Sequence, residues 1–129
     1  MGVKDMADRI RIKIGGKSIY AEINSSQTAR LFLKSLPLKL SLGRWGDEYY
    51  GNCGINTSRE ENARADMEVG ELAIWPDGSG FCIFFGPTPA STNGKPKASS
   101  PVNPIGKIEG DVSFLKELPH SVNAEIEKL

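Results

Sequence analysis

The chain has 129 residues, and its 16 lysines and arginines balance 16 aspartates and glutamates, so the formal net charge is zero. Without a positive field or a basic run interleaved with aromatic residues, we expect neither nucleic acid nor a membrane surface as a partner. No segment approaches the roughly 18 consecutive apolar residues of a membrane span or resembles a signal peptide, which predicts a cytoplasmic protein. The 14 glycines and 8 prolines favour a turn-rich β protein, a single domain over 1–129 with frayed ends at 1–8 and 127–129.

The first part of the chain predicts a hairpin, a helix and a strand. Isoleucine alternates with charged residues over 9–14, Gly15-Gly16 supplies a tight turn, and the alternation resumes over 17–23. The segment 27–36 carries an apolar stripe at helical spacing behind a run of capping residues, so we expect a helix that closes one end of the sheet. Alternating leucines over 38–42 predict a half-buried strand.

The most informative pattern is the segment Gly70–Pro89, where two apolar, aromatic-rich stretches flank the turn sequence Pro-Asp-Gly-Ser-Gly. Neither stretch alternates with polar residues, which predicts that both faces of this hairpin are covered. The pattern is typical of the central hairpin of a closed or strongly curved sheet.

The remainder of the chain is less regular. Its Pro, Gly and Ser content makes 90–104 either a flexible loop, the favoured interpretation, or a functional flap. A strand is expected over 105–110, a second short helix over 111–118 and a terminal strand over 122–126.

Few residues offer familiar catalytic or metal chemistry. His120 is the only histidine, with no second histidine or cysteine pair near it, so we expect no metal and no cofactor. Cys53 and Cys82 are expected to be reduced thiols within strands, and a disulfide between them is the alternative. No nucleophile elbow is present. Adjacent acidic pairs such as Asp47-Glu48 point to opposite faces of a strand and do not form an acid–base dyad.

Three strings of residues carry a family resemblance. The segments Arg44–Tyr50, Phe81–Pro89 and Ser100–Gly106 resemble characteristic blocks of the cyclophilin superfamily, specifically of its small bacterial and archaeal cyclophilin-like branch, which has no established function. The resemblance covers about residues 9–118. It implies a mainly β fold, a closed antiparallel cyclophilin-like β-barrel capped by two short helices.

The positions that serve prolyl isomerisation in true cyclophilins are changed in this chain. Along the matching strings, the family's arginine falls on Asn56, its glutamine on Gly80 and one pocket phenylalanine on Cys82. Asparagine donates no charge-assisted hydrogen bond to a twisted amide, so no catalytic residue is carried over from the resemblance. Arg44, on the neighbouring loop, is the candidate replacement donor.

The aromatic residues are expected to be mostly core, with a groove for an apolar or proline-containing ligand as the alternative. We predict a binding protein rather than an enzyme, which takes a peptide or a small carboxylate or apolar ligand in a groove near Arg44. A weak peptidyl-prolyl isomerase and an accessory subunit of an amide-hydrolysing complex are the alternatives, and a homodimer is left open. The predicted ligand-binding residues are Arg44, Trp45, Tyr49, Asn56, Phe81 and Phe84.

Overall fold

The computed structural model describes residues 8–129. Of the predicted frayed end 1–8, residues 1–7 lie outside the described residues, and Asp8 begins the first strand. The described residues form one α-helix, one 3₁₀ helix and nine strands. In chain order they are β1 (Asp8–Ile14), β2 (Lys17–Ile23), α1 (Gln27–Ser35), β3 (Leu38–Arg44), β4 (Glu48–Asn52), β5 (Arg64–Asp66), β6 (Glu71–Trp75), β7 (Gly80–Phe84), β8 (Lys97–Ile108), η2 (Ser113–Glu117) and β9 (Ser121–Lys128).

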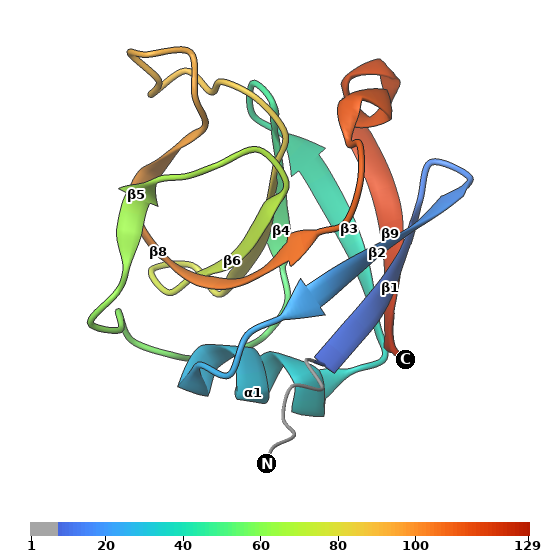
Figure 1. Ribbon diagram of the computed structural model, residues 1–129, viewed down its shortest axis with the longest axis vertical. Coiled ribbons are helices and arrows are strands. Elements are labelled where there is room, and N and C mark those ends of the chain that lie inside the picture. The colour runs from blue at the N-terminus through green and yellow to red at the C-terminus, as the bar shows by residue number, and fades with distance from the viewer. Residues whose placement is uncertain (1–7) are drawn as a thin grey trace.

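Eight of the strands form a closed ring, and every pairing within it is antiparallel (Figure 1). The order is β2-β1-β9-β3-β4-β7-β6-β8, and pairing between β2 and β8 closes the ring. The ninth strand, β5, pairs only with β8 and lies outside the ring. The mainly β class predicted from the alternation of apolar residues is therefore confirmed.

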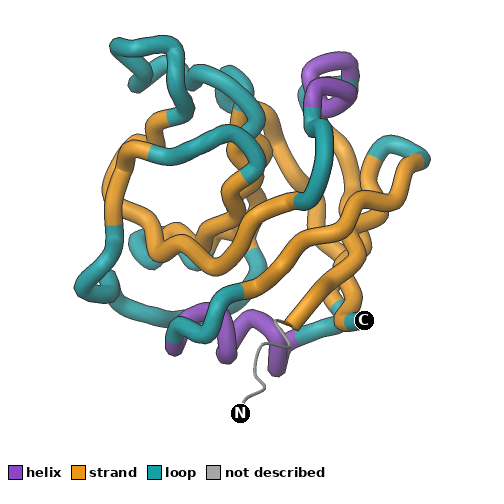
Figure 2. Tube along the Cα trace, viewed as in Figure 1, coloured by secondary structure: helices purple, strands orange, loops and turns teal. Residues whose placement is uncertain are grey.

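The ring encloses the main hydrophobic core, to which every ring strand contributes inward side chains. The α-helix and the 3₁₀ helix lie at opposite ends of the ring, where Figure 2 shows them in purple. Phe32 of α1 stacks on Phe81 of β7 at 5.4 Å between ring centroids, and Leu115 of η2 is fully buried at the other end. Each end of the core is thus closed by apolar side chains from a helical segment.

The central hairpin is confirmed as the pair β6–β7, and both of its faces are covered. Phe81 and Ile83 point into the main core, whereas the alternate residues Cys82 and Phe84 belong to a second, smaller apolar cluster on the outer face. That cluster is covered by an arm, defined as β5 together with the first half of β8. Apolar and polar residues do not alternate in β7 because both faces of this strand are buried.

The structure corrects the prediction of a second α-helix. Residues 111–118 contain only one short 3₁₀ helix, η2, instead of an α-helix. Asp111 accepts hydrogen bonds from the backbone N–H and the hydroxyl of Ser113, so it closes a local turn. Only a few residues separate this turn from Pro119. So short a segment forms too few hydrogen bonds to offset the free-energy cost of nucleating an α-helix.

The expected loop over 90–104 is also corrected, because a long strand, β8, begins at Lys97. Pro104 lies opposite Ala73, where the register between β6 and β8 shifts. A proline lacks an N–H and is tolerated at such an irregularity, so it does not interrupt the strand. At the C-terminus, β9 runs to Lys128 and the N–H of Leu129 bonds to the carbonyl of Arg9. The fraying of 127–129 stays a prediction.

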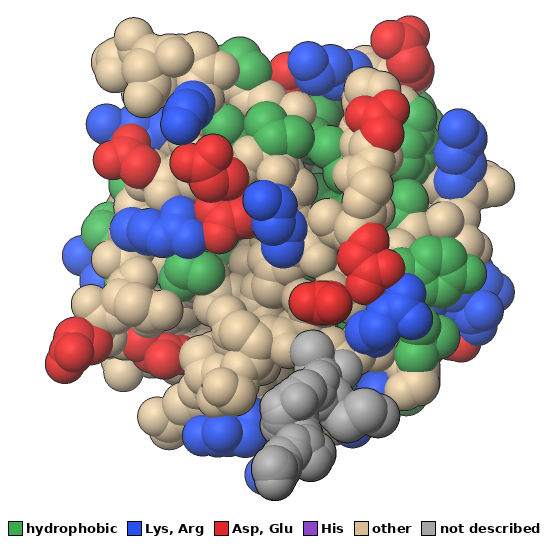
Figure 3. All heavy atoms as spheres, in the orientation of Figure 1, with side chains coloured by type: hydrophobic (Ala, Val, Ile, Leu, Met, Phe, Trp, Pro, Cys, Tyr) green, Lys and Arg blue, Asp and Glu red, His purple; other side chains and the backbone are tan. Residues whose placement is uncertain are grey.

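No helix within residues 8–129 is long and apolar enough to cross a membrane. On the face shown in Figure 3, acidic and basic side chains are intermixed. The two cysteines are buried, unpaired thiols. Cys82 lies in β7 as expected, whereas Cys53 directly follows β4 instead of lying within a strand.

Candidate functional site

A cavity of about 310 Å³ opens on the outer face of the ring, between β4, β7 and the arm. It lies on the same side of the sheet as the second apolar cluster, which supplies part of its wall. Glu48 is the only residue with a charged side chain among those that line it. The lining residues are Trp45, Glu48, Tyr50, Trp75, Cys82, Ala98, Ser99 and Val102.

Trp45 and Glu48 are brought together by the turn between β3 and β4. Their backbones exchange both hydrogen bonds, at 2.8 Å from Trp45 N to Glu48 O and 3.2 Å from Glu48 N to Trp45 O. Residues that form such an antiparallel pair direct their side chains to the same face of the sheet. Tyr50, two residues after Glu48, lies on that face as well. The indole, the carboxyl and the phenol therefore share one wall.

This turn is held rigidly by the segment that follows β7. Gly46 adopts a φ of +61°, and a Cβ there would lie 2.8 Å from the backbone of Thr88, so the turn requires glycine. Asp47 donates its N–H to Pro87 and accepts from the N–H of Phe85. Two of the strings that carried the family resemblance, Arg44–Tyr50 and Phe81–Pro89, are thus packed against each other at the cavity.

The third of those strings supplies the opposite wall and positions Trp75. The indole Nε1 of Trp75 donates to the Ser100 hydroxyl at 2.7 Å, and that hydroxyl lies 3.2 Å from Asp77 Oδ2. On the other side, a Cβ at Gly78 would lie 2.4 Å from the Trp75 ring, so the indole packs directly against this glycine. Trp75 is held from two directions, which fixes one side of the cavity.

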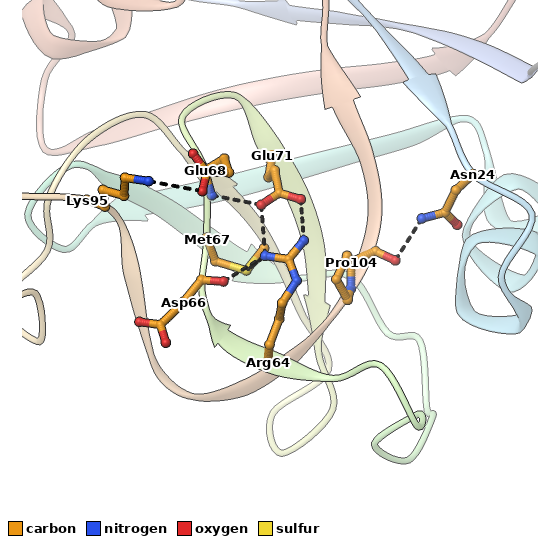
Figure 4. Close-up of polar contacts among 8 residues, drawn as sticks. All are labelled: Asn24, Arg64, Asp66, Met67, Glu68, Glu71, Lys95 and Pro104. Carbon is orange, nitrogen blue, oxygen red and sulfur yellow. Dashed lines mark hydrogen bonds and ion pairs between the residues drawn. The ribbon is translucent and has the colours of Figure 1, made fainter.

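The arm is tied to the ring by an ion pair between Arg64 and Glu71, which Figure 4 shows. Arg64 makes two hydrogen bonds to the Glu71 carboxylate, at 2.9 and 2.6 Å, and contacts the buried Met67. Although burial raises the pKa of Glu71, the bonds from Arg64 and from the N–H of Glu68 outweigh it and lower that pKa overall. The pair thus stays ionised and holds the arm over the outer apolar cluster.

Glu48 is the most unusual group of the cavity. Its side chain belongs to a residue only 5% exposed, and Oε1 has no hydrogen-bond partner among the described residues. Burial raises its pKa to about 7, although the neighbouring Cys82 thiol acts to lower it. Burial, followed by the nearby Glu48 charge, raises the pKa of Cys82 well above its ordinary value. Cys82 is therefore a protonated wall residue and a poor nucleophile.

Arg44, the centre of the predicted groove, lies outside the cavity lining. Its guanidinium donates to the carbonyls of Gly46, Lys116 and Leu118 at 2.8, 3.0 and 3.3 Å, and pairs with Asp47 at 2.7 Å. It therefore connects the β3–β4 turn to η2 and uses its donors within the protein. A ligand role for Arg44 stays a prediction.

The other predicted site residues are distributed over several places. Trp45 lines the cavity. Tyr49 and Phe81 are buried in the main core, and the Tyr49 hydroxyl donates to the carbonyl of Pro119. Phe84 is buried in the outer cluster, and the exposed Asn56 accepts a hydrogen bond from Ser79. Of the six residues, only Trp45 lines this cavity.

The sequence analysis did not single out Glu48, Tyr50, Trp75, Cys82 and the β8 residues as a site. A usable signal was present in β4: a charged residue two positions before a tyrosine, in a strand beside the entirely apolar β7. In an antiparallel pair, Glu48 faces Phe84 and Tyr50 faces Cys82, so the carboxyl had to enter an apolar environment. Only the pairing of β4 with β7, which the sequence did not reveal, converts that pattern into a prediction.

A second, more open cleft of about 420 Å³ lies between β2, β6 and β8. Its floor includes Arg64, Glu71 and Lys107, with the Arg64–Glu71 pair already satisfied. Among residues 8–129, no group of three or more His, Cys, Asp or Glu side chains could hold a metal ion. The cavity beside Glu48 is therefore the candidate site.

Comparisons with known proteins agree with the ring topology. A hypothetical protein of Archaeoglobus fulgidus, known from a solution structure, is 32% identical, and each chain is covered over its full length with a TM-score of 0.79. A protein named McbB, in complex with tryptophan, has the same fold at a TM-score of 0.68 and 12% identity, over 92% of this chain and 44% of its own. Among curated proteins, none matches. The family model described as Cyclophilin-like matches residues 8–127, and the chain therefore belongs to the Cyclophilin-like family.

Proposed function

We propose that this protein is a binding module for a small, largely apolar ligand, which enters the cavity between β4, β7 and the arm and is oriented by Glu48. The observation that carries the proposal is a buried carboxyl whose Oε1 lacks a partner and which lines an aromatic cavity. Buried polar groups in folded proteins are nearly always hydrogen-bonded, so an unpaired one at an opening is typical of a binding site.

The composition of the cavity supports a ligand with an apolar body. Trp45, Tyr50 and Trp75 offer aromatic surface, and Ala98 and Val102 leave room on the arm side. A volume of about 310 Å³ is at the lower end of small-molecule sites and fits a single-ring compound. A peptide could reach this cavity only through one side chain.

Support for a site near Arg44 is weaker, because that guanidinium is bonded to three backbone carbonyls and one carboxylate of the protein itself. We therefore place the ligand on the adjacent face of the same turn, and not at Arg44 as predicted from the sequence. Trp45 is the predicted residue that remains in the site.

The test is a titration with 2-phenylethanol, 2-phenylethylamine and 3-phenylpropionate, followed by backbone amide chemical shifts. Binding of at least one probe should shift the amides of Trp45, Glu48, Trp75 and Cys82. Ser99→Phe, at the exposed rim of the cavity, should weaken that binding at least about tenfold by blocking entry, equivalent to about 1.4 kcal/mol.

The matched control is Ser18→Phe, because Ser18 is an exposed serine on β2 and does not line the cavity. The control should leave probe binding unchanged. If none of the probes shifts these amides, or if both phenylalanine variants bind as the parent does, the cavity is not a ligand site and the proposal is wrong.

A further inference from the structure

The charge of the cavity is set by one group. Glu48 is the only lining residue with a carboxyl group, and no lysine, arginine or histidine lines the cavity. The other titratable lining groups are the Tyr50 phenol and the Cys82 thiol, and burial keeps the Cys82 thiol protonated. When Glu48 ionises, the cavity therefore carries a single negative charge with no counter-ion.

An uncompensated buried carboxylate is unfavourable, and a bound cation would remove the penalty. The raised pKa of Glu48, about 7, reflects the work of placing its charge in this environment. A ligand ammonium would donate to the unpaired Oε1 and supply the missing opposite charge, and such charge-assisted bonds are the strong ones. A neutral ligand would satisfy the hydrogen bond alone, and an anionic ligand would add repulsion.

The aromatic walls favour the same kind of ligand. Indole and phenol rings attract cations through their negative faces, and tryptophan does so most strongly. Trp45 and Trp75 come from opposite sides of the cavity, the first from the β3–β4 turn and the second from the end of β6. The faces of the three aromatic rings and the ionised carboxyl are all negative, so the cavity lining attracts a cation.

Resting on the ligand-binding function proposed above, we propose that the ligand is an organic cation, a protonated amine on an apolar or aromatic body, whose ammonium donates to Glu48 among Trp45, Tyr50 and Trp75. The amine would be anchored at the inner end of the cavity, with the apolar body extending between the two indoles toward Ser99 at the rim.

The experiment uses three probes that share a phenyl ring and a short chain and differ in charge: 2-phenylethylamine, 2-phenylethanol and 3-phenylpropionate. The chain has two tryptophans, Trp45 and Trp75, and both line the cavity. Their fluorescence, excited where the probes do not absorb, therefore reports occupancy directly. Each probe is titrated against the full chain at pH 6 and pH 8.

At pH 8 the amine should bind at least about tenfold more tightly than the alcohol, and the carboxylate more weakly than either. Lowering the pH to 6 should weaken amine binding about tenfold, because with a pKa of about 7 most of Glu48 is then protonated and only the ionised fraction is competent. The affinity of the alcohol should change less than about twofold by the same reasoning.

Glu48→Gln should abolish the preference for the amine and its pH dependence while it keeps the cavity and the binding of the alcohol. Glu61→Gln is the matched control, since Glu61 is an exposed glutamate that does not line the cavity, and it should behave as the parent. The ranking of the probes on the unmodified protein stands even if the Glu48→Gln protein does not fold.

The outcomes separate the two proposals. If the alcohol or the carboxylate binds as tightly as the amine at pH 8, or if the preference for the amine survives in Glu48→Gln, the cation assignment is overturned while the ligand site stands. If none of the probes changes the fluorescence of Trp45 and Trp75, both the site and the cation assignment fail.

Discussion

Two neighbouring charged residues, Arg44 and Glu48, differ in how far the protein itself satisfies them. Arg44 donates to three carbonyls and a carboxylate, and its guanidinium lies 5.2 Å from the Phe85 ring centroid. Glu48 lies at the other end of the same turn, buried, with Oε1 unpaired. A satisfied cation stabilises the fold, whereas an unsatisfied buried anion costs stability.

The first prediction concerns the pH dependence of stability. Glu48 titrates near 4.5 in an unfolded chain and at about 7 when folded, so the folded state binds the proton more tightly. Its contribution to stability is fully present below pH 4 and is lost as the pH rises through 7, by an amount on the order of 3 kcal/mol. Glutamine does not titrate. Between pH 4 and pH 8 the free energy of unfolding of Glu48→Gln should therefore rise relative to the parent by that order.

Urea denaturation of the two proteins at pH 4, 6 and 8 measures this difference. Glu61→Gln, at an exposed site, should show no comparable gain. Parallel pH profiles for the parent and Glu48→Gln would mean that the carboxyl is solvated in the folded protein, against the burial described above.

The second prediction concerns Gly78, which lies under the Trp75 ring. In Gly78→Ala the new Cβ would lie 2.4 and 2.7 Å from two atoms of the Trp75 ring, so the indole must move. The displaced ring should alter tryptophan emission and weaken probe binding severalfold, with a loss of stability below about 1 kcal/mol because Trp75 is only partly buried. Gly43→Ala is the control, because a Cβ there meets nothing within 4 Å. Unchanged emission in Gly78→Ala would show that Trp75 is not held by this glycine.

At the scale of elements, the β6–β7 hairpin is the part of the chain on which both apolar clusters depend. Its inward residues join the main core and its outward residues join the cluster beneath the arm. β8 belongs to both clusters as well: its first half pairs with β5 over the outer cluster, and its second half pairs with β2 and closes the ring. The candidate site is lined by residues of the first half of β8, Ala98, Ser99 and Val102.

The third prediction tests that dependence through Phe81, which is fully buried and stacks on Phe32 of α1. Phe81→Ala should lower the free energy of unfolding by about 3–5 kcal/mol, through lost burial and the cavity that remains. Leu31→Ala, on the exposed side of the same helix at 37% exposure, should cost less than about 1 kcal/mol. Chemical denaturation measures both, and equal losses in the two variants would show that the hairpin is peripheral to the core.

At the scale of the whole molecule, an eight-stranded ring closed at its ends leaves its outer face for function. The interior is filled by side chains, so a ligand cannot enter the ring itself. The arm of β5 and β8 converts part of the outer face into a cavity, and the Arg64–Glu71 pair in Figure 4 holds the arm in place.

The fourth prediction is that prolyl isomerase activity is absent or very weak. The position to which the resemblance assigns the isomerase arginine is Asn56, whose side chain is a neutral amide that accepts a hydrogen bond from Ser79. Loss of one preorganised donor lowers a rate by about 10²–10³-fold. Arg44 donates to the carbonyls of Lys116 and Leu118, so we expect that it does not replace the missing donor. An NMR exchange measurement on an Ala-Pro peptide tests this, and acceleration at catalytic protein concentrations that Arg44→Ala abolishes would contradict it.

The sequence by itself determined those local elements whose pattern of apolar residues fits only one type of secondary structure. Alternating isoleucines specified β1 and β2, the helical stripe specified α1, and the unalternating β7 specified burial on both faces. The same method was wrong for 97–104, where the prolines suggested a loop, and for 111–118, where a short capped run suggested an α-helix, while the strand predicted from residue 105 is part of β8. A proline at a register shift is acceptable only if the neighbouring strand provides that shift.

The candidate site was decided by the tertiary structure. Trp45, Glu48, Trp75 and Val102 are distant in sequence, and only the pairing of β4 with β7 and the folding of the arm over them enclose one cavity. A glutamate in a strand is typical of a solvent-facing position. Its neighbours in the sequence do not indicate that other strands will cover that face of the sheet. Burial is a property of the long-range contacts, and the unpaired carboxyl that defines this site exists only once those contacts exclude water from it.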